Sequence, residues 1–306
     1  MGTPFGRGTD RGYQPIADYA LIGDSHVAAL VAADGSIDWC CFPRVDGPAA
    51  FCRLLDAERG GWWQVTPSGR FASARTYAGL TNVLATTFTT AGGQCRLTDL
   101  MPVRPRAGTR HGEDIGPSHR ILRLIEGLAG EVEVEIGFRP TFDYARTATT
   151  ITPHAGGAVA RAGRESLALA CPVALALDGA GAARGRVRVA AGARFWLDLV
   201  YRADEDAGAM PDRASDPDTE LARTLAYWQA WAAACTDDGP YRELVRRSAL
   251  ALKLLTFEPT GAVVAAPTAS LPEAIGGLRK WDYRYTWLRD ATLIVYALQE
   301  IGYHAE

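Results

Sequence analysis

Residues 279–290 of this chain read RKWDYRYTWLRD, and an apolar helical run over residues 291–301 follows at once. Four aromatic side chains, three arginines, one lysine and two aspartates fall within these twelve residues. Sugars are recognised by such a mixture, because their C–H faces pack on aromatic rings while their hydroxyls bond charged donors and acceptors. The composition agrees equally well with a buried aromatic cluster and an ion pair at the start of a helix.

The spacing within this stretch favours a shared site. Every second residue from Trp281 to Trp287 is aromatic, and Arg289 continues the same period. A period of two predicts an extended segment with one aromatic face. A helix that begins only at Ala291 would let Arg289 and Asp290 reach one cavity, whereas neighbouring positions within a helix point apart. Asp290 is also a natural N-cap for that helix, so a purely capping role for it stays open.

The overall composition indicates a folded protein of about two domains. Of its 306 residues 48% are hydrophobic and 22% charged, which is enough apolar material for a core. The net charge of −3 and the absence of a Lys/Arg block argue against a nucleic-acid partner. No apolar run approaches the ~18 residues of a membrane span, and the N-terminus lacks the apolar core of a signal peptide. We therefore expect no membrane association and a cytoplasmic protein, with export by another route left open.

The cysteines and histidines do not form a metal motif. No C-x-x-C pair and no clustered Cys/His spacing occur, so neither a metal site nor a cofactor is expected. Free, partly buried thiols are predicted, and reductant should leave the melting temperature unchanged. The cysteines are Cys40, Cys41, Cys52, Cys95, Cys171 and Cys235, and the adjacent first two should face opposite sides of a strand. His26 lies beside Asp24 and Ser25, but without a G-x-S-x-G elbow we interpret it as structural.

Residues 13–210 alternate short apolar runs with turn signals, which predicts a large antiparallel β-sandwich. Asp34-Gly35 between the runs 26–32 and 36–42 is a strong hairpin signal. Residues 131–138 place apolar side chains at alternate positions, as in a half-exposed antiparallel strand. Residues 1–12 are expected to be disordered and residues 104–118 to form a loop. Further strands are expected near residues 62–65, 82–90, 95–101, 119–126, 166–177, 184–190 and 193–201.

The pattern becomes helical after residue 210. Asp216-Pro217 provides an N-cap followed by proline at the first helical position, which predicts a linker helix within residues 211–240. Residues 241–255 predict a second helix, and residues 261–273 form an extended stretch of small residues that allows close packing. The apolar side of the second helix should carry Leu244, Ser248, Ala251, Leu252 and Leu255.

Four stretches carry a resemblance to a known family: IADYALIGDSH at residues 16–26, DGSIDW at 34–39, LLTFEPTG at 254–261 and WDYRYTWLRD at 281–290. They resemble family 15 glycoside hydrolases, which include glucoamylases, glucodextranases and bacterial trehalases, and are closest to the bacterial trehalase and glucoamylase-like branch. The resemblance implies an N-terminal antiparallel β-sandwich followed by the start of an (α/α)6 barrel in residues 241–306. It also implies inverting hydrolysis of α-glucosidic bonds, in trehalose or at non-reducing ends of maltose and α-glucans, with release of glucose.

The resemblance also assigns substrate-binding residues. In glucoamylase-like members the Tyr, Trp, Arg and Asp of the last motif line the subsite for the terminal glucose, and in this chain those positions are Tyr283, Trp287, Arg289 and Asp290. Arg289 and Asp290 would hold sugar hydroxyls, while the two aromatic rings would wall the pocket.

The catalytic pair is not assigned to any residue of this chain. Inverting hydrolysis needs a general acid and a general base roughly 6.5–9.5 Å apart. The family carries both as Glu residues further along the barrel, so we expect them beyond Glu306 and interpret Glu258 and Glu273 as structural. The chain should then be an inactive front part of an enzyme, whose apolar helix faces promote self-association. The alternative is a noncatalytic β-sandwich module that binds carbohydrate or stabilises a partner.

Overall fold

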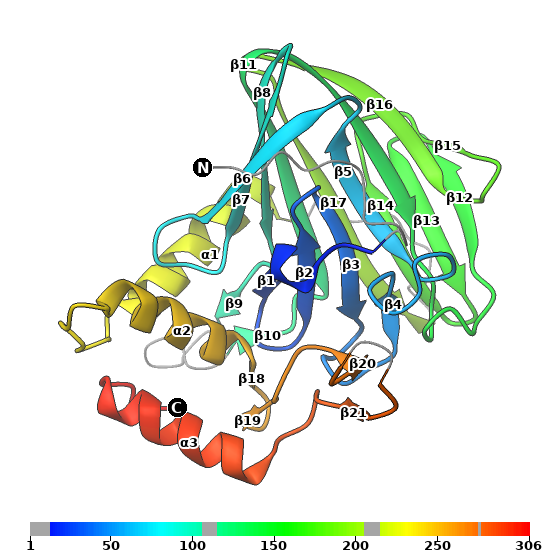
Figure 1. Ribbon diagram of the computed structural model, residues 1–306. Helices are drawn as coiled ribbons and strands as arrows, with labels where there is room; N and C mark the ends of the chain where they lie inside the picture. The colour runs from blue at the N-terminus through cyan, green and yellow to red at the C-terminus, as the bar shows by residue number, and fades with distance from the viewer. Residues whose placement is uncertain (1–12, 106–114, 205–214, 275–276) are drawn as a thin grey trace.

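The computed structural model describes residues 13–105, 115–204, 215–274 and 277–306, so the expected disorder of residues 1–12 lies outside the described residues (Figure 1). A large antiparallel β-sheet region comes first, and α-helices follow it in the sequence. Figure 1 shows α1 (Pro217–Ala232) and α2 (Arg242–Leu254) beside the sheet, with α3 (Leu288–Glu300) running below α2. This order confirms the predicted succession of a β region and a helical region.

The sheet is organised around β11 (Arg120–Arg139), a strand of twenty residues. Its first half pairs with β8 (Gly93–Leu100) and β17 (Arg194–Ala203). Its second half pairs with β5 (Trp62–Pro67) and β16 (Ala183–Ala190). One long strand thus belongs to two halves of the sheet.

The expectation of two separate strands at residues 119–126 and 131–138 was therefore wrong. The chain between them contains Gly127 and Gly130, and a β-bulge lies between Gly127 and Ala129. A bulge and glycines bend a strand without ending its pairing. The apolar alternation itself is confirmed, because Val132, Val134, Ile136 and Phe138 are buried.

The remaining strands of the sheet extend from these central pairs. The main path runs β1-β2-β3-β5-β11-β17-β14-β13-β12, and the other strands pair at its sides. They are β1 (Tyr19–Gly23), β2 (Ala28–Ala32), β3 (Ser36–Cys41), β4 (Ala49–Phe51), β6 (Phe71–Tyr77), β7 (Leu84–Thr90), β12 (Thr150–His154), β13 (Gly157–Ala162), β14 (Glu165–Ala170) and β15 (Ala176–Leu177).

The predicted hairpin at Asp34-Gly35 is confirmed as the connection of β2 and β3. Asp34 Oδ1 accepts hydrogen bonds from the backbone N–H and the hydroxyl of Ser36, at 3.0 and 2.7 Å. Gly35 has a φ of 82°, a conformation that glycine adopts without strain.

One hydrophobic core lies between the two halves of the sheet. It combines Trp63 and Ile136 from one half with Ile121, Leu197 and Leu199 from the other. This layout is consistent with a sandwich. All six cysteines are free and buried, which confirms the thiol prediction, and Cys40 and Cys41 lie in different clusters as strand neighbours should.

Short two-stranded pairs hold the connections outside the main sheet. The loop expected at 104–118 lies partly outside the described residues, and its ends pair as β9 (Arg104–Pro105) and β10 (Ile115–Gly116). Between α2 and α3 come β18 (Thr256–Phe257) with β19 (Ala262–Val263), and β20 (Ala269–Pro272) with β21 (Lys280–Asp282). A 3-10 helix over Ile16–Asp18 precedes β1.

The helices begin largely where the sequence predicts. Asp216 caps α1 by accepting a hydrogen bond from the Thr219 N–H at 3.1 Å, and Pro217 takes the first helical position. Within the part of the chain that the structure describes, no helix combines the length and the apolar character needed to cross a membrane.

The predicted apolar side of α2 was wrong for Leu244, which is 67% exposed. Leu250 and Leu254 are buried instead, in a cluster with Trp228 of α1. Leu254 packs directly on β1, because a Cβ added at Gly23 would lie 2.7 Å from its Cδ2 atom. The absence of a side chain at Gly23 therefore leaves room for Leu254 against β1.

Candidate functional site

Residues 279–290, called here the aromatic segment, lie along the stretch of small residues that precedes them. β21 pairs antiparallel with β20. Two backbone bonds continue this contact, from Ala266 N–H to the Tyr283 carbonyl at 2.9 Å and from Ala265 N–H to the Tyr285 carbonyl at 3.2 Å. The predicted close packing of residues 261–273 is thus realised, and it fixes the path of the aromatic segment.

The backbone of the aromatic segment differs from the prediction in two respects. Its strand ends at Asp282, and α3 begins at Leu288 rather than at Ala291. The N-cap is Trp287 without a side-chain hydrogen bond, so the expectation that Asp290 caps the helix was wrong. Asp290 lies instead in the first helical turn, where a carboxylate is still favoured by the helix dipole.

The predicted alternation of exposure is found only in part, because Leu288 is 86% exposed and Thr286 is exposed although both share the parity of Arg284. Arg284 is buried toward the β region, with 6% of its side chain exposed. Trp281, Tyr285 and Trp287 on the alternate positions are 51%, 54% and 39% exposed. The segment therefore presents aromatic side chains outward while an arginine holds it from behind.

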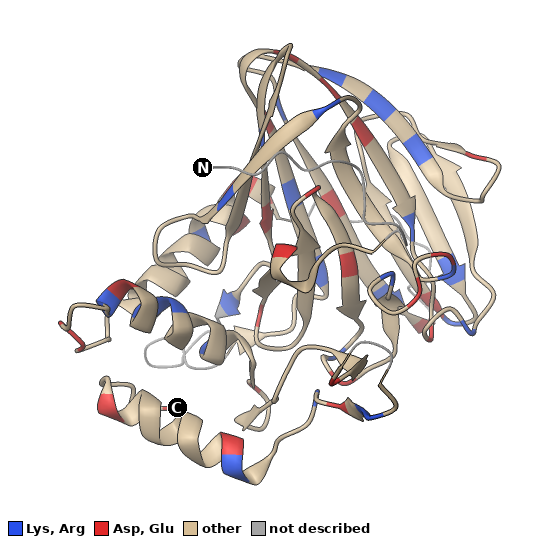
Figure 2. Cartoon of the chain, viewed as in Figure 1, with Lys and Arg blue, Asp and Glu red and all other residues tan. Residues whose placement is uncertain are grey.

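The four residues expected to bind substrate form two pairs that follow one another closely in the sequence. The rings of Tyr283 and Trp287 stack at 5.6 Å between centroids, with an angle of 13° between their planes. Arg289 Nη2 lies 3.2 Å from Asp290 Oδ2. Figure 2 shows this charge pair at the start of α3, next to a largely uncharged remainder of the helix. An apolar stack beside hydrogen-bonding charges is the combination that a sugar ring requires.

Neither glutamate near the segment faces this stack as a free carboxylate. Glu258 is buried, and its Oε2 atom lies 3.4 Å from His26 Nε2. Glu273 accepts a hydrogen bond from Trp281 Nε1 at 3.2 Å and pairs with Arg279 at 2.9 Å. The contact between His26 and Glu258 was missed by sequence reasoning, because the two residues are far apart in the chain and belong to no common motif.

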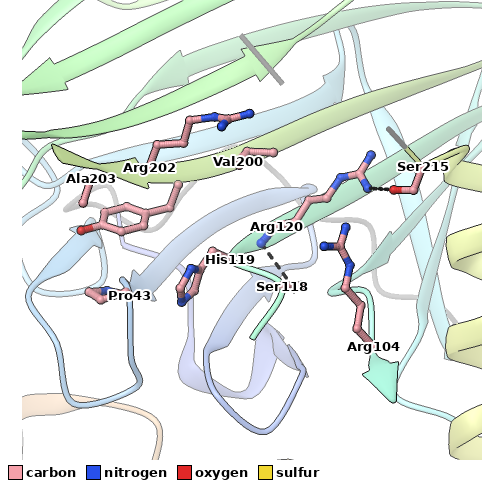
Figure 3. A pocket seen from close by; sticks show the side chains of 10 residues that line it. Pro43, Arg104, Ser118, His119, Arg120, Val200, Arg202, Ala203 and Ser215 are labelled. Atoms are coloured by element: carbon pink, nitrogen blue, oxygen red, sulfur yellow. Dashed lines mark hydrogen bonds between the residues drawn. The ribbon is translucent and has the colours of Figure 1, made fainter. Parts of the chain in front are cut away.

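A cavity of about 550 Å³ lies elsewhere, lined by residues of the β region and by Ser215 just before α1 (Figure 3). Arg104 and Arg120 extend into it from β9 and β11. Arg120 is buried and donates to both carboxylate oxygens of Asp198 at 2.7 Å, while Arg104 lies 3.4 Å from Glu220. The cavity is lined by Pro43, Arg104, Ser118, His119, Arg120, Val200, Tyr201, Arg202, Ala203 and Ser215.

These arginines connect the sheet to the helix. Arg120 Nη1 donates to Ser215 just before α1, and Glu220 belongs to α1. Burial lowers the pKa of His119 in the same cavity, so its neutral form is favoured. We interpret this cavity as part of a structural junction. Among the described residues, no group of three or more His, Cys, Asp and Glu side chains is arranged to hold a metal ion.

Comparisons with known proteins agree with the division of the structure. The model of the family described as trehalase-like, N-terminal, matches residues 8–183, and the model for glycosyl hydrolases family 15 matches residues 239–306. The first match covers most of the β region. The second covers α2, the aromatic segment and α3.

Curated relatives match almost the whole chain. A trehalase of Thermoplasma volcanium is 36% identical over 303 residues, which cover 97% of this chain and 46% of the relative. A trehalase of Mycolicibacterium smegmatis is 34% identical over 313 residues, covering 96% and 46%. A trehalase of Mycobacterium tuberculosis is 34% identical over 312 residues, covering 96% and 45%. The chain thus spans somewhat less than half the length of these relatives.

Proposed function

The chain belongs to glycosyl hydrolase family 15, with a trehalase-like N-terminal region, and on that premise we propose that its aromatic segment forms one wall of a glucose subsite. The enzyme that contains this subsite hydrolyses α-glucosidic bonds with inversion and releases glucose. Trehalose is the preferred candidate substrate, because the similar curated proteins are trehalases. Maltose and the non-reducing ends of α-glucans are the alternatives within the same reaction class.

We propose the following division of the chain. Residues 13–210 form a β-sandwich, residues 211–240 contain the linker helix, and residues 241–306 begin an (α/α)6 barrel. The core shared by the two sheet halves supports the first part. The cluster that joins α1, α2 and β2 supports a firm connection between the parts. The burial of all six thiols agrees with a reducing compartment, which is why we propose the cytoplasm.

The observation that carries the proposed function is the stack of Tyr283 on Trp287, followed in the first turn of α3 by the pair of Arg289 and Asp290. Trp287 is 39% exposed and offers apolar surface to a sugar ring. The Arg289 side chain is 76% exposed and can turn its donors toward sugar hydroxyls, while Asp290 can accept hydrogen bonds from them.

We propose that the general acid and base are not among the described glutamates near the segment. Glu258 is engaged with His26 in the interior, and Glu273 is tied to Arg279 and Trp281. We therefore expect the 306-residue chain to bind trehalose without hydrolysing it. Glucose release by the pure chain would show that a carboxylate of these 306 residues is catalytic.

A matched pair of arginine variants tests the binding proposal. Arg289 and Arg279 both belong to the aromatic segment, both are 76% exposed and both pair with a carboxylate. Arg289→Ala should weaken trehalose binding by about 1.5–3 kcal/mol, because hydrogen bonds to a charged group are lost. Arg279→Ala should change it by less than about 0.5 kcal/mol. Titration calorimetry with trehalose measures both.

The affinity of the wild-type chain for trehalose determines how large a loss of binding calorimetry can measure in the variants. A one-walled subsite should bind in the millimolar range, about −4 kcal/mol, so Arg289→Ala should abolish detectable binding. Equal losses in the two variants would contradict the assignment of Arg289. In an active enzyme that contains this segment, the same loss should appear in kcat/KM.

A further inference from the structure

Arg284 is the charged side chain at the back of the aromatic segment. It lies between Tyr283 and Tyr285, yet its side chain is only 6% exposed while Tyr285 is half exposed. Its Nε and Nη2 atoms donate to the two carboxylate oxygens of Asp282, at 2.9 and 2.7 Å. This bidentate pair makes a rigid planar unit from two neighbours of the aromatic rings.

The remaining donor of Arg284 reaches into the β region. Nη1 donates to the carbonyl oxygen of Gly47, with the Val45 carbonyl at 3.5 Å and the Cys41 sulfur at 3.4 Å. Cys41 ends β3, and the other two residues belong to the connection from β3 to β4. The guanidinium thus fills a socket, defined here as Cys41, Val45 and Gly47, that is formed entirely by the β region.

A second contact ties the neighbouring stretch to the same face of the β region. Trp39 of β3 is fully buried, and its Nε1 atom donates to the Pro267 carbonyl at 2.6 Å. Ala269 of β20 packs in one cluster with Trp39 and Cys41. β20 pairs with β21. The hydrogen bond from Trp39 to Pro267 and those from Arg284 to the socket therefore hold the same pair of strands against the β region.

We propose that Arg284 is a positioning residue, through which the socket of the β region sets the orientation of the Tyr283–Trp287 stack. The part that concerns sugar binding rests on the proposed function. Arginine is required at this position because its planar fork bonds the Asp282 carboxylate and the socket carbonyls at the same time. A lysine keeps the charge but places it at a single point, so it can satisfy only one of the two partners.

Hydrogen exchange on the 306-residue chain tests the positioning directly. In Arg284→Met, amides of residues 281–287 should exchange about tenfold faster, because local opening of the segment becomes easier. Arg284→Lys should give an intermediate increase. Arg279→Met is the matched control, since this arginine lies in the same segment but is mostly exposed, and it should change the exchange by less than about twofold.

The exchange rates of the β11 amides show whether a variant loosens only the aromatic segment or destabilises the whole chain. Their exchange should stay unchanged in all three variants, because the hydrogen bonds of Arg284 go to Asp282 and to the socket, not to β11. Equal acceleration in β11 and in the segment, or no acceleration in the segment, would overturn the proposal. If Arg284→Met does not fold, Arg284→Lys decides by the same two measurements.

Trehalose binding distinguishes failure of this inference from failure of the proposed function. If the wild-type chain binds trehalose, Arg284→Met should raise the dissociation constant at least about fivefold and Arg284→Lys should recover part of the loss. Unchanged affinity with accelerated exchange would show that the socket holds the segment but not the stack, which overturns the proposal. If the wild-type chain does not bind trehalose, the proposed function fails, while the exchange rates still decide whether the socket orders the segment.

Discussion

Two buried arginines show how the β region and the aromatic segment differ. Arg123 lies in the centre of the β region, fully buried, and pairs with Asp99 while donating to the carbonyls of Trp63 and Gly35. Arg284 uses the same means, a carboxylate partner and backbone carbonyls. Around Arg123 the apolar side chains are enclosed, whereas in the segment that contains Arg284 the side chains of Trp281, Tyr285 and Trp287 remain exposed.

The difference shows that a buried charge can serve two purposes. In the β region it satisfies polar backbone groups that the core has removed from water. In the aromatic segment it lets the chain keep exposed rings in a defined position without a core of their own.

Arg123→Met should destabilise the chain by about 3–5 kcal/mol, because Asp99 is left as an unpaired charge in the core. The Trp63 and Gly35 carbonyls also lose a donor. The measurement is denaturant unfolding followed by circular dichroism. The control is Arg96→Met, whose partly exposed pair with Glu126 should contribute no more than about 1 kcal/mol. A cost below about 1 kcal/mol for Arg123→Met would mean that the interior relaxes or admits water.

Sequence reasoning succeeded where a short pattern decides the outcome. The hairpin at Asp34-Gly35, the alternation of residues 131–138 and the cap at Asp216 depend on neighbours a few residues away. Local chemistry is sufficient in these cases because the interacting groups are close in the chain.

The predictions were wrong where contacts between distant parts of the chain determine the local structure. The continuity of β11 depends on partners on either side of its bulge. The buried side of α2 packs on residues far away in the chain, such as Gly23 and Trp228, and the socket of Arg284 depends on the connection between β3 and β4. The start of α3 is a local exception, where a carboxylate suited to capping pairs with Arg289 instead. The sequence therefore located the candidate site but not what holds it in place.

Leu254→Ala should cost about 3 kcal/mol, because it leaves a cavity between α2 and β1. The variant tests whether the contact between α2 and the β region contributes as much to stability as contacts within the sheet. Leu244→Ala is the control on the same helix, since Leu244 is largely exposed and its loss should cost less than about 0.5 kcal/mol. Thermal unfolding measures both variants. Equal effects would show that α2 does not depend on its contact with Gly23.

Low pH should loosen the aromatic segment, because protonation of Asp282 weakens its ion pair with Arg284. Hydrogen bonding to Arg284 lowers the pKa of Asp282, so the stabilisation is complete above the ordinary Asp value of about 4 and is lost as the pH falls through the lower folded value. The effect should not exceed about 1 kcal/mol, because the carboxylate is one-third exposed and screened by solvent.

Tryptophan fluorescence between pH 7 and pH 2 follows this transition. Asp282→Asn serves as the control, since it removes the titrating group and should remove the part of the change that belongs to the segment. Identical titration curves for the two proteins would contradict the role of Asp282. Loosening between pH 5 and pH 7 in the wild type would point to a group other than this carboxylate.

The smallest expected effect on stability comes from the exposed face of α3. Leu293 is 61% exposed, and Leu288 and Tyr296 near it are exposed as well. Leu293→Glu should therefore change the free energy of unfolding by less than about 0.5 kcal/mol. It should nevertheless reduce self-association, because exposed apolar patches associate and a charge on the patch opposes that. Light scattering over a concentration series measures this, with Gln299→Glu as a control that adds the same charge at an exposed polar position. A wild-type chain that stays monomeric at high concentration would contradict the expectation, and equal effects of the two variants would assign it to net charge rather than to this face.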